Sequence, residues 1–245
     1  MLHLWSSTAI DADVGEVELS PVLSDEHGVS GNGTEPNGTV TSGPFAWLPL
    51  SYSNLDERNE SQVSLAPHYL TRAFGVAEKA HPEFPTFSHA DSSAAVNRLL
   101  TTTGSNFSAF ASMLEGIRKN FSVIDPGLHG GVHRAIGGDM MQAHSSNDPI
   151  QIMHHANLDR LWWQWQTGQT THISNATASA AVDKKDLDGR FWAYHGPTVE
   201  YDIDPTGGPE ASLFDVQTVQ GLMVPNAETY KLIDIERPPL CYTYV

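Results

Sequence analysis

The sequence has 245 residues, enough for one large domain or two small ones with a substantial core. Hydrophobic residues make up 40% and charged residues 17% of the chain, which excludes an ordinary disordered protein, and no apolar run is long enough to span a bilayer. The 13 Lys and Arg against 29 Asp and Glu give a net charge of -16, which argues against nucleic acid or an anionic membrane surface as a partner. The single cysteine, Cys241, excludes a disulfide scaffold, a zinc ribbon and a CxxC redox site.

The N-terminal segment and the asparagines bear on localisation. Residues 1–7 do not have the positive region and sustained apolar run of a signal peptide. Asn-X-Ser/Thr triplets are nevertheless more frequent than Ser and Thr abundance alone would give, and they begin at Asn32, Asn37, Asn59, Asn106, Asn120 and Asn175. We therefore expect a glycoprotein that is secreted in its full-length form; chance triplets in Ser/Thr-rich loops are the alternative.

The first part of the chain contains few helical signals. Residues 1–65 read as irregular, with a turn-rich loop at 31–38. A short helix is possible over 66–75, before Pro82 and Pro85 interrupt the chain. Asp91 resembles the N-cap of a modest amphipathic helix that follows it.

Three further helices are predicted with clearer signals. Apolar residues repeat at three and four over 107–117, and a helix over 129–136 should stop at Gly137 and Gly138. The clearest helix has Asp148 as its cap and Pro149 at its first position, and it runs to Gln166. Residues 169–245 read as loops and a few strands. We predict one mainly α domain over 1–245, with its helices in 66–168.

The chain contains 12 histidines, and four of them lie on the last two predicted helices. His129 and His133 are four residues apart, so both imidazoles lie on one helical face and can bind one metal ion. Chance alone gives about 0.6 such pairs in this chain, so the pair needs structural context. His154 and His155 on the next helix supply it, because a short connection lets the two helices pack antiparallel with their histidines facing.

Adjacent residues on a helix point about 100° apart, so His154 and His155 are not both easily ligands of the same ion. One should bind the metal while the other packs or forms hydrogen bonds in support. Three neutral imidazoles suit copper, zinc or iron. A polar core in which the histidines are satisfied by hydrogen bonds is the alternative that spacing alone leaves open.

The two segments that carry these histidines, residues 129–140 and 147–163, closely resemble the second copper-binding motif of the tyrosinase and polyphenol oxidase family. The resemblance implies a type-3 copper protein on a four-helix bundle, in which two coppers, each held by three histidines, bind dioxygen. It implies that His129, His133 and His155 are the ligands of the second copper, CuB, and that His154 supports them. It further implies an ion pair of Asp159 and Arg160 that braces the helix.

The resemblance extends beyond the copper motif. Residues 20–33 and 43–45 are similar to the segment between the two copper motifs of fungal members. Tyr242-Thr243-Tyr244 resembles the Y-x-Y motif that closes the core of fungal tyrosinases.

The first copper motif of the family, CuA, is not present. His3, His27, His68, His81 and His89 do not have its His-Arg or helical context, so no residue is assigned to CuA. Side-on dioxygen binding needs two coppers, and half of the bundle would also be missing. The chain therefore resembles the C-terminal part of a tyrosinase core. We expect it to be an N-terminally truncated oxidase, incomplete by itself; a non-catalytic, mononuclear copper-binding remnant is the alternative.

Finer differences from the family concern the substrate. Gly130 stands where enzymes that hydroxylate monophenols (monooxygenases) commonly have Asn, and it offers no acceptor. Gln151 replaces a Phe that normally packs on a ligand imidazole, while Gly130 and Arg134 would lie at the substrate entrance. The resemblance implies copper-dependent oxidation of o-diphenols, or of monophenols or o-aminophenols, to quinones with O2. A zinc hydrolase lacks the glutamate base that it would need beside the ligands.

Overall fold

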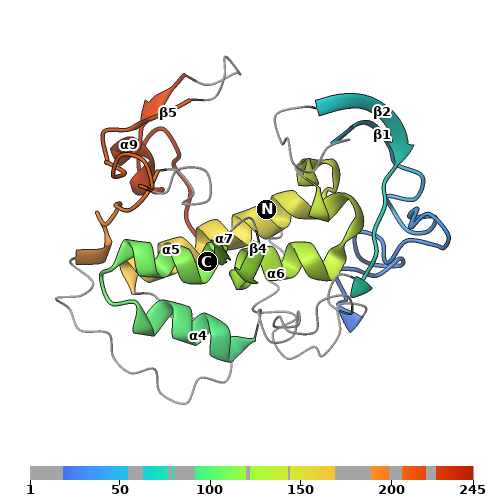
Figure 1. Ribbon diagram of the computed structural model, residues 1–245, viewed down its shortest axis with the longest axis horizontal. Helices are drawn as coiled ribbons and strands as arrows, with labels where there is room; N and C mark the ends of the chain where they lie inside the picture. The colour runs from blue at the N-terminus through green and yellow to red at the C-terminus, as the bar shows by residue number, and fades with distance from the viewer. Residues whose placement is uncertain are drawn as a thin grey trace.

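The structure is a computed structural model that describes residues 19–54, 63–76, 79, 92–119, 122–142, 144–168, 189–198, 206–218 and 225–244. Helices carry most of its regular structure, together with three two-stranded antiparallel sheets (Figure 1). The helices are α4 Ser93–Thr102, α5 Phe107–Glu115, α6 Gly127–Ile136, η2 Gly138–Met141, η3 Ser145–Asn147, α7 Ile150–Thr167 and α9 Tyr230–Ile233. The strands are β1 Pro49–Asn54, β2 Val63–Tyr69, β3 Ile117–Lys119, β4 Ser122–Asp125, β5 Val216–Gln217 and β6 Ala227–Glu228.

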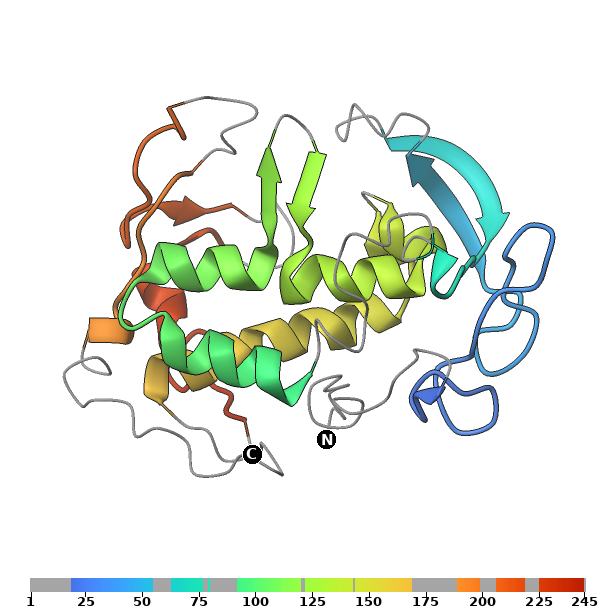
Figure 2. The same cartoon turned by 60° about the horizontal axis from the view of Figure 1, so that its bottom comes forward.

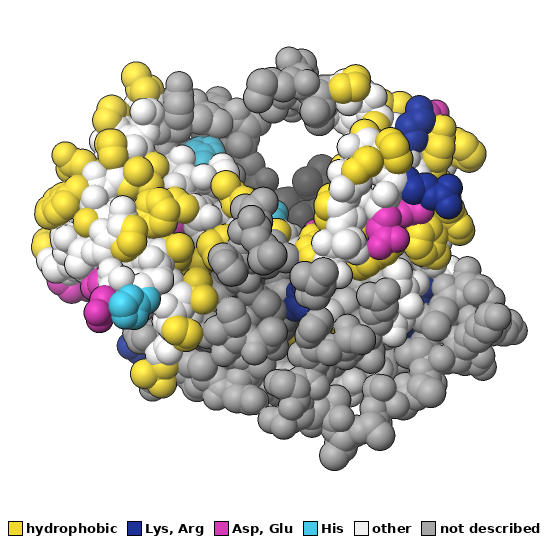
Figure 3. All heavy atoms as spheres, turned by 180° about the vertical axis from the view of Figure 1, so that it is seen from behind, with side chains coloured by type: hydrophobic (Ala, Val, Ile, Leu, Met, Phe, Trp, Pro, Cys, Tyr) yellow, Lys and Arg dark blue, Asp and Glu magenta, His cyan; other side chains and the backbone are white. Residues whose placement is uncertain are grey.

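The four longer helices, α4 to α7, occupy the middle of the molecule. Figure 2 shows α6 and α7 running in opposite directions, with α5 and α6 nearly end to end and the β3–β4 hairpin rising between them. The β1–β2 hairpin lies at one end of the helices and the C-terminal segment at the other. Seen from behind, histidine side chains are visible among the described residues (Figure 3). Among the described residues, no helix has the length and apolar character needed to cross a membrane.

Side-chain caps and a buried aromatic cluster explain where α4 and α5 lie. Ser92 caps α4 by accepting from the Ala95 N–H at 3.2 Å, so the prediction of Asp91 as the cap is wrong by one residue. Asn106 caps α5 in the same way. Phe110 of α5 stacks on Trp165 of α7 at 4.5 Å, in the core that joins α4, α5 and α7.

The histidine-bearing helices begin and end close to the predicted positions. Helix α6 ends at Gly137, which has a φ of +65°, so the predicted stop is confirmed. Helix α7 extends to Thr167 and ends at left-handed Gly168. The N-cap of α7 is Pro149 and its first residue is Ile150, so both positions are one residue later than predicted. The predicted cap, Asp148, accepts from the Ile150 N–H at 3.1 Å, and its carboxylate also forms a bidentate ion pair with Arg72, with both side chains 0% exposed. This ion pair ties the start of α7 to the segment that follows β2.

The prediction of a helix over 66–75 is wrong, and so is the prediction that 1–65 is irregular throughout. Residues 49–54 and 63–69 pair as the antiparallel strands β1 and β2, with a bulge after Leu50. Along β2, Leu65, Pro67 and Tyr69 are exposed while the residues between them are partly buried. This two-residue alternation is typical of a strand with one face covered, and the pairing with β1 overrides the weak helical signal.

The C-terminal segment returns to α7 through the two tyrosines singled out in the sequence. The hydroxyls of Tyr242 and Tyr244 both lie 2.5 Å from Oδ2 of Asp159, and Tyr244 is partly buried. Burial and the Asp159 carboxylate raise the pKa of both tyrosines above 10.0. The structure thus gives Asp159 two tyrosine partners, while Arg160, its expected ion-pair partner, donates to Asn157 Oδ1 at 2.8 Å.

Replacing Tyr244 by Phe should lower the free energy of unfolding by about 1–2 kcal/mol, because it removes a hydrogen bond to a carboxylate. Urea unfolding measures the change, with Tyr69→Phe on the exposed face of β2 as the matched control. Because the folded state raises the tyrosine pKa, the stabilisation is complete below pH 10 and is lost as the pH rises above it. Equal stabilities of the Tyr244 and Tyr69 variants would contradict this role.

Candidate metal centre

Three imidazole nitrogens converge between α6 and α7. His129 and His133 lie one turn apart on α6, and their Nε2 atoms are 3.0 Å apart. Nε2 of His155, in the second turn of α7, lies 3.3 Å from Nε2 of His129. The structure therefore brings His129 close to each of the other two predicted ligands.

The two separations from Nε2 of His129 are compatible with ligands of a single metal ion. Imidazole nitrogens bind zinc or copper at about 2.0–2.1 Å, which places tetrahedral neighbours about 3.3 Å apart. The observed separations of 3.0 and 3.3 Å match that geometry. Without a cation, two lone pairs at this distance repel unless a proton lies between them. The donor set thus fits a metal that accepts neutral nitrogen ligands.

Two acceptors fix the orientation of the rings on α6. Nδ1 of His133 lies 2.6 Å from the Met140 carbonyl oxygen, and Nδ1 of His129 lies 2.6 Å from Oε2 of Glu115. A carbonyl and a carboxylate only accept hydrogen bonds, so both Nδ1 atoms carry the proton and both Nε2 lone pairs point to the centre. This is the arrangement that supports histidine ligands of metals in other proteins.

Glu115 contacts a predicted ligand but was not predicted from the sequence as a residue of the site. It is the last residue of α5, and Gly116 with a φ of +95° then turns the chain so closely that a Cβ would meet the Asp125 carbonyl oxygen at 2.3 Å. This turn brings the end of α5 against the start of α6. In the sequence, Gly116 directly after an amphipathic helix signals a sharp turn beside Glu115. It does not show that Glu115 contacts His129.

The surroundings favour neutral imidazoles at His133 and His155. Burial, with the neighbouring histidines, lowers the pKa of His133 to about 4 and also lowers that of His155. Burial opposes ionisation of Glu115, but the hydrogen bond from His129 and the adjacent imidazoles lower its pKa overall. Neutral imidazoles beside an ionised carboxylate are the protonation states that metal binding requires.

His154 is the second histidine of α7 near the centre. Its side chain is 1% exposed, and its Nε2 lies 3.2 Å from the backbone carbonyl oxygen of His129. His129, His133 and His154 form a group whose ligand atoms all lie within 4.8 Å of one another. Because Nε2 of His154 faces that carbonyl, Nδ1 is the ring nitrogen that His154 can offer to a metal, whereas His155 presents Nε2 toward Nε2 of His129. The assignment of His155 as ligand and His154 as support stays a prediction.

The remaining predicted site residues lie around these histidines. A Cβ on Gly130 would meet only the Pro126 Cβ, at 3.4 Å, so this position on α6 has room for a side chain. Arg134 lies partly buried in the last turn of α6. Gln151 is partly buried in the first turn of α7, and its amide forms no hydrogen bond with any histidine that the structure describes.

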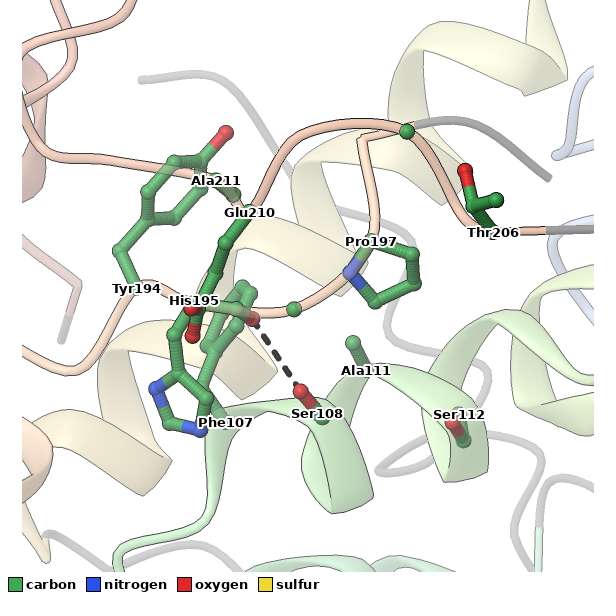
Figure 4. A pocket seen from close by; sticks show the side chains of 12 residues that line it. Phe107, Ser108, Ala111, Ser112, Tyr194, His195, Pro197, Thr206, Glu210 and Ala211 are labelled. Carbon is green, nitrogen blue, oxygen red and sulfur yellow. Dashed lines mark hydrogen bonds between the residues drawn. The ribbon is translucent and has the colours of Figure 1, made fainter. Parts of the chain in front are cut away.

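A separate cavity of about 540 Å³ lies over the N-terminal half of α5. Figure 4 shows Ser108 and Ser112 of α5 on one wall and His195 and Glu210 of the C-terminal segment on the other. The Ser108 hydroxyl donates to the His195 carbonyl oxygen at 3.2 Å. The three converging histidines do not line this cavity, so it is distinct from the metal centre.

Replacing Glu115 by Ala should weaken metal binding by about 10–100-fold, the usual effect of losing a group that orients a histidine ligand. Glu115→Gln keeps an acceptor for the His129 N–H and should lose less. Zinc affinity measured by competition with a chelator gives the comparison, with Glu210→Ala as an exposed control. If Glu115→Ala binds zinc as the wild type does, the carboxylate has no part in the centre.

The fold and the site together define a mainly α protein with a helix-borne group of histidines that could hold a metal ion. The family model described as the common central domain of tyrosinase matches residues 5–168, more than half of the chain. The chain therefore belongs to the tyrosinase family, and its mainly α fold is tyrosinase-like, as the sequence predicted.

Individual relatives agree with this membership. The tyrosinase-like protein phomQ1 of Diaporthe leptostromiformis is 27% identical over 99% of this chain and 56% of its own length. A tyrosinase of Streptomyces lincolnensis is 33% identical over 73% of the chain and 60% of its own length. A polyphenol oxidase variant from Thermothelomyces thermophila superposes with a TM-score of 0.67 at 21% identity, covering 94% of this chain and 63% of that one. The chain thus spans little more than half the length of these curated relatives.

Proposed function

We propose that this protein is a copper-dependent oxidase that converts o-diphenols to quinones with O2. One observation carries the proposal: in a member of the tyrosinase family, Nε2 of His129 lies 3.0 Å from that of His133 and 3.3 Å from that of His155, while acceptors hold Nδ1 of His129 and His133. When bound, copper would supply the redox chemistry that transfers electrons from a phenol to dioxygen.

The chain's own residues would hold and shape the site. His129, His133 and His155 would bind the metal, and Glu115 with the Met140 carbonyl would keep the first two rings in place. Gly130 and Arg134 would border the approach of the substrate. Gly130 leaves this approach open and offers no side-chain acceptor for a phenolic proton, so we propose diphenols rather than monophenols as substrates.

A second function, copper binding without turnover, also has support. Within the described residues, one group of histidines, His129, His133 and His154, could hold a metal ion. The chain spans 56–60% of the curated relatives named above, so the activity of the whole enzyme is a proposal for this chain.

Copper titration of the full chain, with oxygen uptake on catechol, separates these functions. Two coppers per chain with catechol turnover support the oxidase, and one copper without turnover supports the binding protein. A chain that binds no copper contradicts both. Tyrosine as a second substrate tests the preference for diphenols.

We also propose that the protein is a secreted glycoprotein. Asn37 begins one of the triplets within the described residues, and its side chain is exposed in a turn. Expression through a eukaryotic secretory pathway should give a mass that falls after endoglycosidase treatment. An unchanged mass, or protein retained in the cell, would contradict this proposal.

A further inference from the structure

A buried carboxylate links the β1–β2 hairpin to the segment after α6. Asp139 in η2 is 4% exposed. Its Oδ2 accepts from the backbone N–H and the hydroxyl of Thr71, both at 2.8 Å, and its Oδ1 lies 2.9 Å from Nε2 of His68. The backbone N–H of Asp139 donates to the Thr71 carbonyl oxygen at 3.0 Å. These four hydrogen bonds hold η2 against the end of β2.

The next residue after this carboxylate orients a metal ligand. Met140 is completely buried, and its carbonyl oxygen lies 2.6 Å from Nδ1 of His133. Gly138 lets η2 approach β2 closely, because a Cβ there would meet the Thr71 carbonyl oxygen at 2.2 Å. The position of the Met140 carbonyl therefore depends on how η2 is fixed to β2.

His68 adds a charge to this contact. Its Nδ1 lies 2.8 Å from the Ala66 carbonyl oxygen while its Nε2 faces Asp139, so both ring nitrogens face acceptors. Only the doubly protonated imidazole can donate to both. Burial opposes this charge, but the hydrogen bonds to Asp139 and Ala66 raise the pKa of His68 overall. The contact is thus a charge-assisted hydrogen bond.

We propose that Asp139 and His68 are positioning residues for the metal centre. By fixing η2 to β2, they hold the Met140 carbonyl where it keeps Nδ1 of His133 protonated and Nε2 directed at the metal. The inference rests on the proposed function and deepens it. It assigns to two residues that are not ligands, Asp139 and His68, the positioning of the ligand His133.

The test uses variants of the full chain, with zinc alone as the metal probe. Asp139→Ala removes the acceptor for three hydrogen bonds. Asp139→Asn can keep them, because its oxygen accepts from Thr71 and its amide donates to a neutral His68. Thr103→Ala is the matched control, because it removes a buried hydrogen bond from Trp165 at the other end of α7.

Zinc affinity should fall by about tenfold in Asp139→Ala, which is the lower end of the losses seen when a group that orients a metal ligand is removed. Asp139→Asn should restore the wild-type affinity. In the metal-free protein, the NMR signal of the His133 Nδ1–H should persist in the wild type, Asp139→Asn and Thr103→Ala, and broaden or vanish in Asp139→Ala. If Asp139→Ala does not fold, His68→Ala, at a partly exposed position, should show the same two changes to a smaller degree.

The inference would be overturned if Asp139→Ala bound zinc as the wild type does and kept the His133 signal unchanged. If only His68→Ala folds, the same result in that variant would overturn it. An equal loss in Thr103→Ala would overturn it too, since the effect would then be general destabilisation. Failure of the wild type to bind zinc or copper would contradict the proposed function instead. In that case the His133 signal of the metal-free variants still decides whether Asp139 positions the ring.

Discussion

Replacing His155 by alanine is expected to weaken binding of one zinc or copper ion by more than about 100-fold. Loss of a group that only orients a ligand weakens binding by up to about 100-fold, and His155 is expected to be a ligand itself. The reason is geometric: Nε2 of His155 lies 3.3 Å from Nε2 of His129, close enough for both nitrogens to bind the same ion. The variant should otherwise stay folded, because His155 is exposed on the surface of α7. Competition with a chelator measures the affinity.

His154→Ala should behave differently from its neighbour. It empties a buried site and removes the contact to the His129 carbonyl, so it should cost about 2–4 kcal/mol of unfolding free energy with a smaller loss of metal affinity. His27→Ala, on an exposed loop beside Glu26, is the control for removing any histidine. If His154→Ala rather than His155→Ala abolishes binding, the third ligand has been assigned to the wrong residue.

Loss of the buried ion pair should have the largest effect on stability. Arg72→Met leaves Asp148 buried without its cation, and breaking such a pair typically costs about 3–5 kcal/mol. The loss extends beyond the pair, since Arg72 Nη1 also donates to the Val29 carbonyl oxygen at 3.0 Å and so anchors the preceding loop. Urea unfolding should show the change as a lower midpoint.

Two controls separate the ion pair from other effects. Arg237→Met removes an exposed cation beside Asp234 and should cost less than about 1 kcal/mol. The double variant Arg72→Met with Asp148→Leu should regain part of the lost stability, because no buried charge is left alone. An Arg72→Met midpoint equal to that of the wild type would show that Asp148 is satisfied without Arg72.

The sequence could predict the helices that carry the histidines, because their signals are local. The three-and-four spacing of α5, Gly137 after α6 and Gly168 after α7 each mark an element within a few residues. The hairpin of β1 and β2 could not be read in this way, since its strands are stabilised by pairing with each other and its second strand contains Pro67.

The three converging histidines could be predicted from their spacing and from the resemblance, but what holds them could not. Glu115 reaches His129 across a sharp turn, and His133 is held by a backbone carbonyl that no side-chain pattern encodes. Arg72 and Asp148 are 76 residues apart, and His68 and Asp139 are 71 apart. Such partners depend on tertiary contacts, which local periodicity does not report.

Nε2 atoms of His129, His133 and His155 are expected to bind one metal ion together. Titration of ¹⁵N-labelled protein with zinc, followed by NMR of the imidazole nitrogens, identifies the ligand atoms. These three Nε2 signals should shift together and stop changing at one zinc ion per chain, while Nδ1 of His129 and His133 stays protonated. Shifts at Nδ1 of His154 in place of His155, or unchanged signals from the pair on α6, would contradict this expectation.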